Sequence, residues 1–106
     1  MSIPPGTVIV EIDYEERILP IRTDFEELEA GPVAVRGTLV KRAREIGKIE
    51  DENGIGLEYS GNRFSKEKLE RLEVGDLVWM GGIYVGRFGP FKIDILKVYD
   101  CGIIEK

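Results

Sequence analysis

VAVRGTLVKRA, residues 33–43, alternates between two kinds of side chain and predicts the fold. One face would carry Val33, Val35, Gly37 and Leu39, and the other Ala34, Arg36, Thr38, Val40 and Arg42. A period of two residues is typical of a strand with one buried side, so we expect a long strand here. Gly37 in its middle suggests a bend or a close approach of another backbone.

Two short strands are expected next, KIED (48–51) and IGLEY (55–59). Asn53-Gly54 between them is a strong signal for a hairpin turn. Ile49, Leu57 and Tyr59 would face the core, which places Glu50 and Glu58 on the outer surface.

FSKEKLERLEVGD (64–76) predicts a helix. Ser65 can cap its start, Leu69 and Leu72 give an apolar stripe, and Gly75 suits the position after its end. Phe64 and Leu69 have the spacing of a hydrophobic staple.

The strands LVWMGGIYVGRF (77–88) and FKIDILKVYD (91–100) follow, joined by a Gly89-Pro90 turn. Trp79 is expected to fill the core. A bulge at Gly81-Gly82 would reverse which residues of the first strand face inward.

The first 31 residues differ from the rest. TVIVEI (7–12) and RILPI (17–21) read as a strand pair, with Pro20 at an edge, and DFEELEAGP (24–32) as one helical turn. Eight acids and two bases give this segment a charge of −6, whereas residues 32–106 carry twelve acids and thirteen bases, a charge of +1.

The order of strands and helix from residue 32 onward resembles the oligonucleotide/oligosaccharide-binding (OB) fold. VAVRGTLVKRARE resembles its bent first strand, KIEDENGIGLEY the hairpin of its second and third strands and LEVGDLVWMGGIYV the Gly-Asp entry to its fourth strand, over residues 32–100. The likeness is nearest to replication protein A-like and tRNA-anticodon-type domains. It implies an all-β, five-stranded OB-fold Greek-key barrel with one short helix between strands 3 and 4, over residues 32–106. Residues 1–31 would be an acidic N-terminal β-hairpin extension.

Composition favours one soluble globular domain of 106 residues. A single cysteine, Cys101, fits a reducing compartment, and the start of the chain does not resemble a signal peptide, so we expect a cytoplasmic protein. The absence of histidine and glutamine and the abundance of charged residues are archaeal-like and thermophile-like.

The same inventory argues against catalysis. Without histidine, neither a serine nor Cys101 has an imidazole base, and zinc lacks its usual ligands. We therefore expect no enzyme, no cofactor and no metal site.

Single-stranded DNA or RNA is the ligand that the resemblance implies, held by stacking and by phosphate contacts in two loops. The first loop spans residues 41–48 and the second residues 86–92. The expected binding residues are Arg36, Lys41, Arg42, Arg44, Lys48, Tyr84, Arg87, Phe88, Phe91 and Lys92.

Other interpretations stay open. Phe91 shares its face with Ile93 and could belong to the core, and the charges at 41–48 could be ordinary solvated residues. Glu50 and Glu58 would repel a phosphate backbone, so a protein-interaction OB module, a subunit or adaptor of a larger assembly, is the alternative. The acidic segment could also shield the binding cleft.

Overall fold

The computed structural model describes residues 6–42, 46–88 and 93–105. Strands dominate it, as expected for an all-β protein. In chain order the elements are β1 (Thr7–Ile12), β2 (Glu15–Arg22), the 3-10 helix η1 (Phe25–Glu27), β3 (Gly31–Lys41), β4 (Ile46–Glu50), β5 (Gly56–Gly61), α1 (Lys66–Glu70), β6 (Leu77–Phe88) and β7 (Ile93–Glu105).

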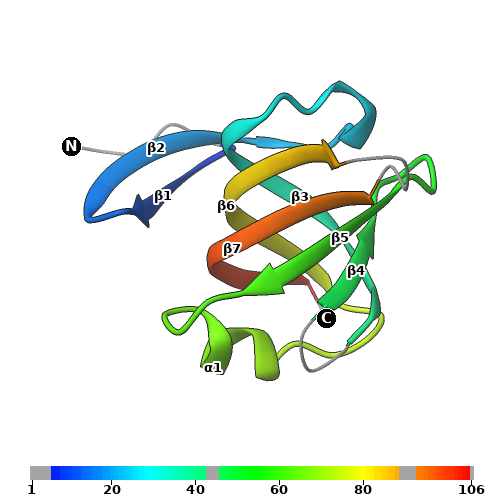
Figure 1. Cartoon of the computed structure of the whole chain (residues 1–106). Coiled ribbons are helices and arrows are strands. Elements are labelled where there is room, and N and C mark those ends of the chain that lie inside the picture. The colour runs from blue at the N-terminus through cyan, green and yellow to red at the C-terminus, as the bar shows by residue number, and fades with distance from the viewer. Residues whose placement is uncertain (1–5, 43–45, 89–92, 106) are drawn as a thin grey trace.

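Five strands close into a barrel (Figure 1). They follow the order β3-β4-β5-β7-β6, and β6 pairs back onto β3. β5 and β7 run parallel, whereas the other neighbours in the barrel are antiparallel. The predicted closed barrel, the short helix between its third and fourth strands and the N-terminal hairpin are confirmed, and the arrangement is compatible with an OB-like barrel.

Aliphatic side chains from successive strands fill the interior of the barrel. Leu39, Ile49 and Leu57 are at most 2% exposed, and Met80 and Leu96 complete the ring from β6 and β7. Burial of side chains of this size supplies about 1.5–3 kcal/mol each, so this layer is the main source of stability.

Tyr59 is buried as predicted, but the prediction that Trp79 fills the barrel is wrong. Trp79 alternates with the buried Met80 and therefore points outward. Its indole packs over Gly102 on β7, where an added Cβ would lie 2.5 Å from Nε1.

Different segments close the two ends of the barrel. Phe25 of η1 packs over Gly37 at one end, where an added Cβ would lie 3.0 Å from the ring and 2.7 Å from the carbonyl oxygen of Glu50. This close approach is the reason for the glycine in β3. Leu69 of α1 and Leu72, two residues after the end of the helix, belong to the same core at the opposite end.

The entry to α1 differs from the prediction in two respects. Asn62 Oδ1 accepts the N–H groups of Phe64 (2.9 Å) and Ser65 (3.1 Å), while Ser65 Oγ donates to the carbonyl oxygen of Val98 (2.7 Å) instead of capping the helix. Phe64 is 59% exposed, whereas Leu69 is buried, so the predicted staple between them is wrong. The 3-residue η1 and the 5-residue α1 lie in the described ranges, where no helix is long and apolar enough to cross a membrane.

The N-terminal hairpin, β1 and β2, is attached to the barrel in two places. β2 pairs in parallel with β3 through Ile21 and Arg22. Val10 of β1 is fully buried and packs against Gly81 of β6, which has no side chain to block it. Because Phe25 also lies in the barrel core, residues 6–31 contribute to the same folded unit.

Candidate nucleic-acid interface

The two loops predicted to share a cleft are carried by strand ends at opposite ends of β5. Ile46, the first residue of β4, is the register partner of Ser60 near the end of β5. β7 begins at Ile93 and runs parallel to β5, with Ile95 as the register partner of Glu58. The first residues of β7 therefore lie beside the first residues of β5. Figure 1 shows the end of β6 and the start of β7 near the β4–β5 turn, away from α1. The prediction that both loops meet at one mouth is therefore wrong.

Three lysines lie on the outer surface of β3, β4 and β7. Lys41 and Lys48 are register partners on β3 and β4, but the Lys48 side chain lies over Gly56 at the start of β5, on the side of β4 away from β3. Lys97 of β7 is the partner of Ser60, which also faces Ile46 across the β4–β5 pair. We call Lys41, Lys48 and Lys97 the lysine end of the barrel. Lys97 was not among the predicted binding residues.

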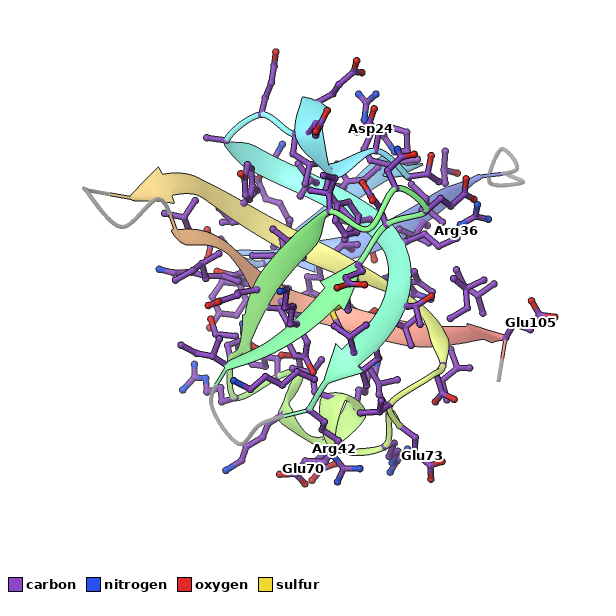
Figure 2. All side chains as sticks on the ribbon, turned by 90° about the vertical axis from the view of Figure 1, so that its right-hand side faces the viewer. Asp24, Arg36, Arg42, Glu70, Glu73 and Glu105 are labelled. Carbon is purple, nitrogen blue, oxygen red and sulfur yellow. The ribbon has the colours of Figure 1, made fainter. Side chains whose placement is uncertain are left out.

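The predicted arginines are divided between the two ends of the barrel. Arg42 lies near the lysine end and donates from Nη1 to the carbonyl oxygen of Leu72, 3.2 Å away. Arg36 is at the other end, where its Nη2 lies 3.4 Å from Glu52 Oε1. Figure 2 shows Arg42 with Glu70 and Glu73 at one end and Arg36 with Asp24 at the other. Arg44, Phe91 and Lys92 lie outside the described residues.

Tyr84 cannot be a surface ligand-binding residue, contrary to prediction. It is 6% exposed and belongs to the barrel core. Tyr84 shares its face of β6 with the buried Val78 and Met80, because the register shift between Gly81 and Gly82 leaves out Tyr99 on β7 and the shift at Val85 comes after Tyr84. Arg87 and Phe88 lie in the same strand, opposite the first residues of β7.

Two acids share the outer face of the β4–β5 hairpin with the lysines. Glu58 is the register partner of Lys48, and Glu50 is the partner of Gly56. Both glutamates are half-buried. Positive and negative charges therefore alternate on the outer face of the β4–β5 hairpin.

A cleft of about 400 Å³ opens next to the lysine end, between the β1–β2 turn, the entry to α1 and β7. Its aromatic lining comes from three separate segments: Tyr14, Phe64 and Tyr99. We call it the hairpin–helix cleft. Phe64 was predicted to be a staple residue, and no prediction involved Tyr14 or Tyr99.

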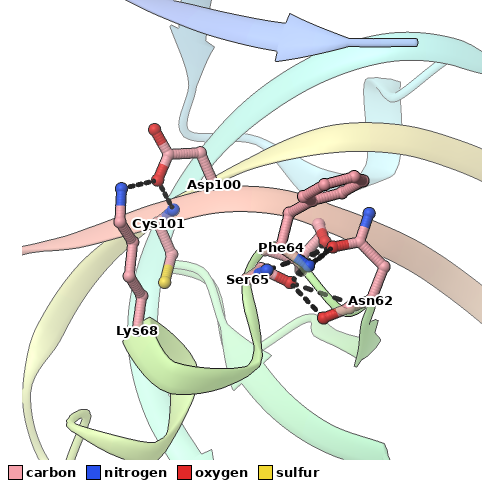
Figure 3. A network of polar contacts seen from close by, with 7 residues as sticks. Asn62, Phe64, Ser65, Lys68, Asp100 and Cys101 are labelled. Carbon is pink, nitrogen blue, oxygen red and sulfur yellow. Dashed lines mark hydrogen bonds and ion pairs between the residues drawn. The ribbon is translucent and has the colours of Figure 1, made fainter. Parts of the chain in front are cut away.

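Polar contacts hold the walls of the hairpin–helix cleft in place. The Tyr99 hydroxyl donates to Asp13 Oδ1 at 3.1 Å, and Lys68 Nζ lies 2.6 Å from Asp100 Oδ1 (Figure 3). The hydrogen bond from Lys68 to Asp100 raises the pKa of the ammonium group. Burial, followed by the bond to Asp13, raises the pKa of the Tyr99 hydroxyl. Both groups keep their protons at neutral pH.

Within residues 6–42, 46–88 and 93–105, no three histidine, cysteine, aspartate or glutamate side chains are grouped so that they could hold a metal ion. Burial, followed by the nearby Asp100 carboxylate, raises the pKa of the Cys101 thiol to about 11. This thiol is therefore protonated at neutral pH and is a weak nucleophile.

No family model matches the chain, and no curated protein matches it.

Proposed function

We propose that this protein is a non-enzymatic OB-like protein that binds single-stranded nucleic acid at the lysine end of its barrel. The observation that carries the proposal is that Lys41, Lys48 and Lys97 lie on the outer surface of three strands, with the Lys48 side chain extending over β5. A single strand that crosses this surface would bring its phosphates to these three cations.

The charge distribution supports contacts to only a few phosphates. Glu58 is the register partner of Lys48, Glu50 lies two residues beyond Lys48 on β4, and the net charge of the chain is −5. Arg87 and Phe88 lie about 13 Å farther along the strand direction, since four residues of β5 separate the two strand ends, and they belong to β6, two strands away from β5. They remain candidate contacts for a longer strand that crosses the whole face.

Titration of a fluorescent mixed-sequence 15-mer, as DNA and as RNA, tests the proposal. We expect micromolar or tighter binding at low salt and at least a tenfold loss in the double variant Lys41→Ala/Lys48→Ala. Arg17→Ala/Arg22→Ala changes the net charge equally on β2, away from the lysine end, and should bind like the wild type. Absence of binding by the wild type at low salt would overturn the proposal.

A protein-interaction module is the second candidate, and the position of β1 favours it. Within the described residues, β1 is the terminal strand of the sheet order and has a ladder with β2 alone. An open strand edge can accept a strand from a partner. Wild-type protein that is folded but does not bind either 15-mer would favour this function.

A further inference from the structure

We propose that the hairpin–helix cleft is a stacking site for a nucleobase of the bound strand. This inference rests on the proposed function for its ligand class, but it concerns a different group of residues from the lysine end. Aromatic rings hold unpaired bases in proteins that bind single strands, because every base has a flat π face.

The cleft exposes aromatic surface that the fold does not use. Tyr14 is 81% exposed and Phe64 is 59% exposed, and Tyr99 is half-buried beside them. These rings come from the β1–β2 turn, the entry to α1 and the middle of β7. A cleft of about 400 Å³ between them has room for a base.

The backbone at Tyr14 points to a role for its side chain. Asp13 and Tyr14 have φ angles of 51° and 68°, in the left-handed region. A two-residue hairpin turn of this kind favours glycine at its second position, and a bulky residue there is strained. Tyr14 is therefore a poor choice for the turn, whereas its ring lines the cleft.

The polar groups of the cleft suit a base better than a phosphate. Arg63 lies 4.8 Å from the centroid of the Phe64 ring, so its charge already has a partner. Lys68 is paired with Asp100. Asn62 uses Oδ1 to hold the turn, and among the described residues its amide NH2 has no hydrogen-bond acceptor, which leaves two donors for a base edge.

Backbone register places the cleft close to Lys97, one of the three lysines. Ile46 of β4, Ser60 of β5 and Lys97 of β7 are successive register partners, and Tyr99 lies two residues beyond Lys97. Two strand spacings, about 10 Å, separate β4 from β7. A strand whose phosphates lie on the lysines would therefore reach the rings after crossing β5.

Binding measurements on Tyr14→Gly and Phe64→Ala test the inference. We expect each variant to bind the 15-mer at least about fivefold more weakly, as expected for loss of one stacking contact. Tyr14→Gly should also melt at the same temperature as the wild type or higher, because glycine suits this turn. That combination separates loss of a ligand contact from loss of structure.

The matched controls are Ile18→Ala and Val74→Ala, which remove exposed apolar side chains outside the cleft. Both should bind normally. Ultraviolet crosslinking of a 5-iodouracil-substituted 15-mer, mapped by mass spectrometry, should identify Tyr14, Phe64 or Tyr99. Titration with adenosine monophosphate distinguishes a free nucleotide from a strand: we expect the 15-mer to bind more tightly, because it also reaches the lysines.

The outcomes separate this inference from the proposed function. If the wild type binds the 15-mer and Lys41→Ala/Lys48→Ala weakens it, the proposed function holds. Normal binding by Tyr14→Gly and Phe64→Ala, with crosslinks elsewhere, then overturns the stacking site alone. Tighter binding of adenosine monophosphate than of the 15-mer overturns the strand as the ligand of this cleft. Failure of the wild type to bind any of these probes overturns both.

Discussion

Asp51 connects two parts of the chain through one carboxylate. It is 8% exposed and accepts the backbone N–H groups of Phe25 (3.0 Å), Asn53 (2.9 Å) and Ile55 (2.9 Å). Burial alone would raise the pKa of this carboxyl, but the three donors together hold it below the ordinary value of 3.8. The charged form therefore fixes both the β4–β5 turn and the segment that closes one end of the barrel.

We predict that Asp51→Ala lowers the free energy of unfolding by about 2 kcal/mol or more at pH 7, since hydrogen bonds to a charged acceptor are lost. The folded-state pKa is depressed, so this stabilisation is fully present above pH 3.8 and is lost as pH falls through the folded pKa. The free energy of unfolding, measured with urea at pH 7 and at pH 3, should differ less between wild type and variant at pH 3. Asp51→Asn keeps an acceptor oxygen, so its free energy of unfolding at pH 7 should lie between those of the wild type and Asp51→Ala. The same difference between wild type and Asp51→Ala at both pH values would contradict this account.

Docking of the N-terminal hairpin depends on the contact between Val10 and Gly81. We predict that Gly81→Ala destabilises the protein by about 1–2 kcal/mol, because the new methyl group meets the Val10 side chain. In a Val10→Ala background, Gly81→Ala should lower the free energy of unfolding by a smaller amount. Urea unfolding should give a coupling energy between the two positions of at least about 0.5 kcal/mol.

Ile18→Ala provides the matched control for this cycle, because Ile18 belongs to the same hairpin but is 55% exposed. Its effect should add to that of Gly81→Ala without coupling. Additivity in the Val10 cycle would show that the hairpin does not dock at Gly81.

Most elements could be predicted from local patterns, because alternation and turn chemistry act over a few residues. β6 has the predicted bounds 77–88, and β1 the predicted bounds 7–12. The burial of Tyr84 follows the alternation of Val78 and Met80, and the prediction of an exposed Tyr84 is wrong because that prediction places Trp79 in the core instead. The exposure of Phe64 depends on Asn62, which takes over the hydrogen bonds expected of Ser65.

The candidate site was less predictable than the fold, because it forms only in the folded molecule. Lys41 and Lys48 were found from their charge and their place beside a loop. Tyr14, Phe64 and Tyr99 are far apart in the sequence, and only the docking of the hairpin beside β7 brings them together. No local pattern marks such a cleft.

At the scale of the whole molecule, the charge distribution predicts a shallow salt dependence. Three lysines that contact phosphates of a single strand should give a slope of about −2 for log K against log salt. Lys41→Ala/Lys48→Ala should bring this slope close to −1. Anisotropy titrations at four or more salt concentrations measure it, and a wild-type slope steeper than about −4 would require many more phosphate contacts than the lysine end supplies.

Closure of the barrel by Phe25 on one side and by Leu69 and Leu72 on the other separates interior from exterior. Among the described residues, aliphatic side chains of the barrel strands are packed between these two closures. We therefore expect any ligand of this protein to bind at the outer surface of the barrel. Substitutions in the barrel core should therefore change the melting temperature without changing ligand binding. The barrel would then be a suitable scaffold for engineered binding surfaces.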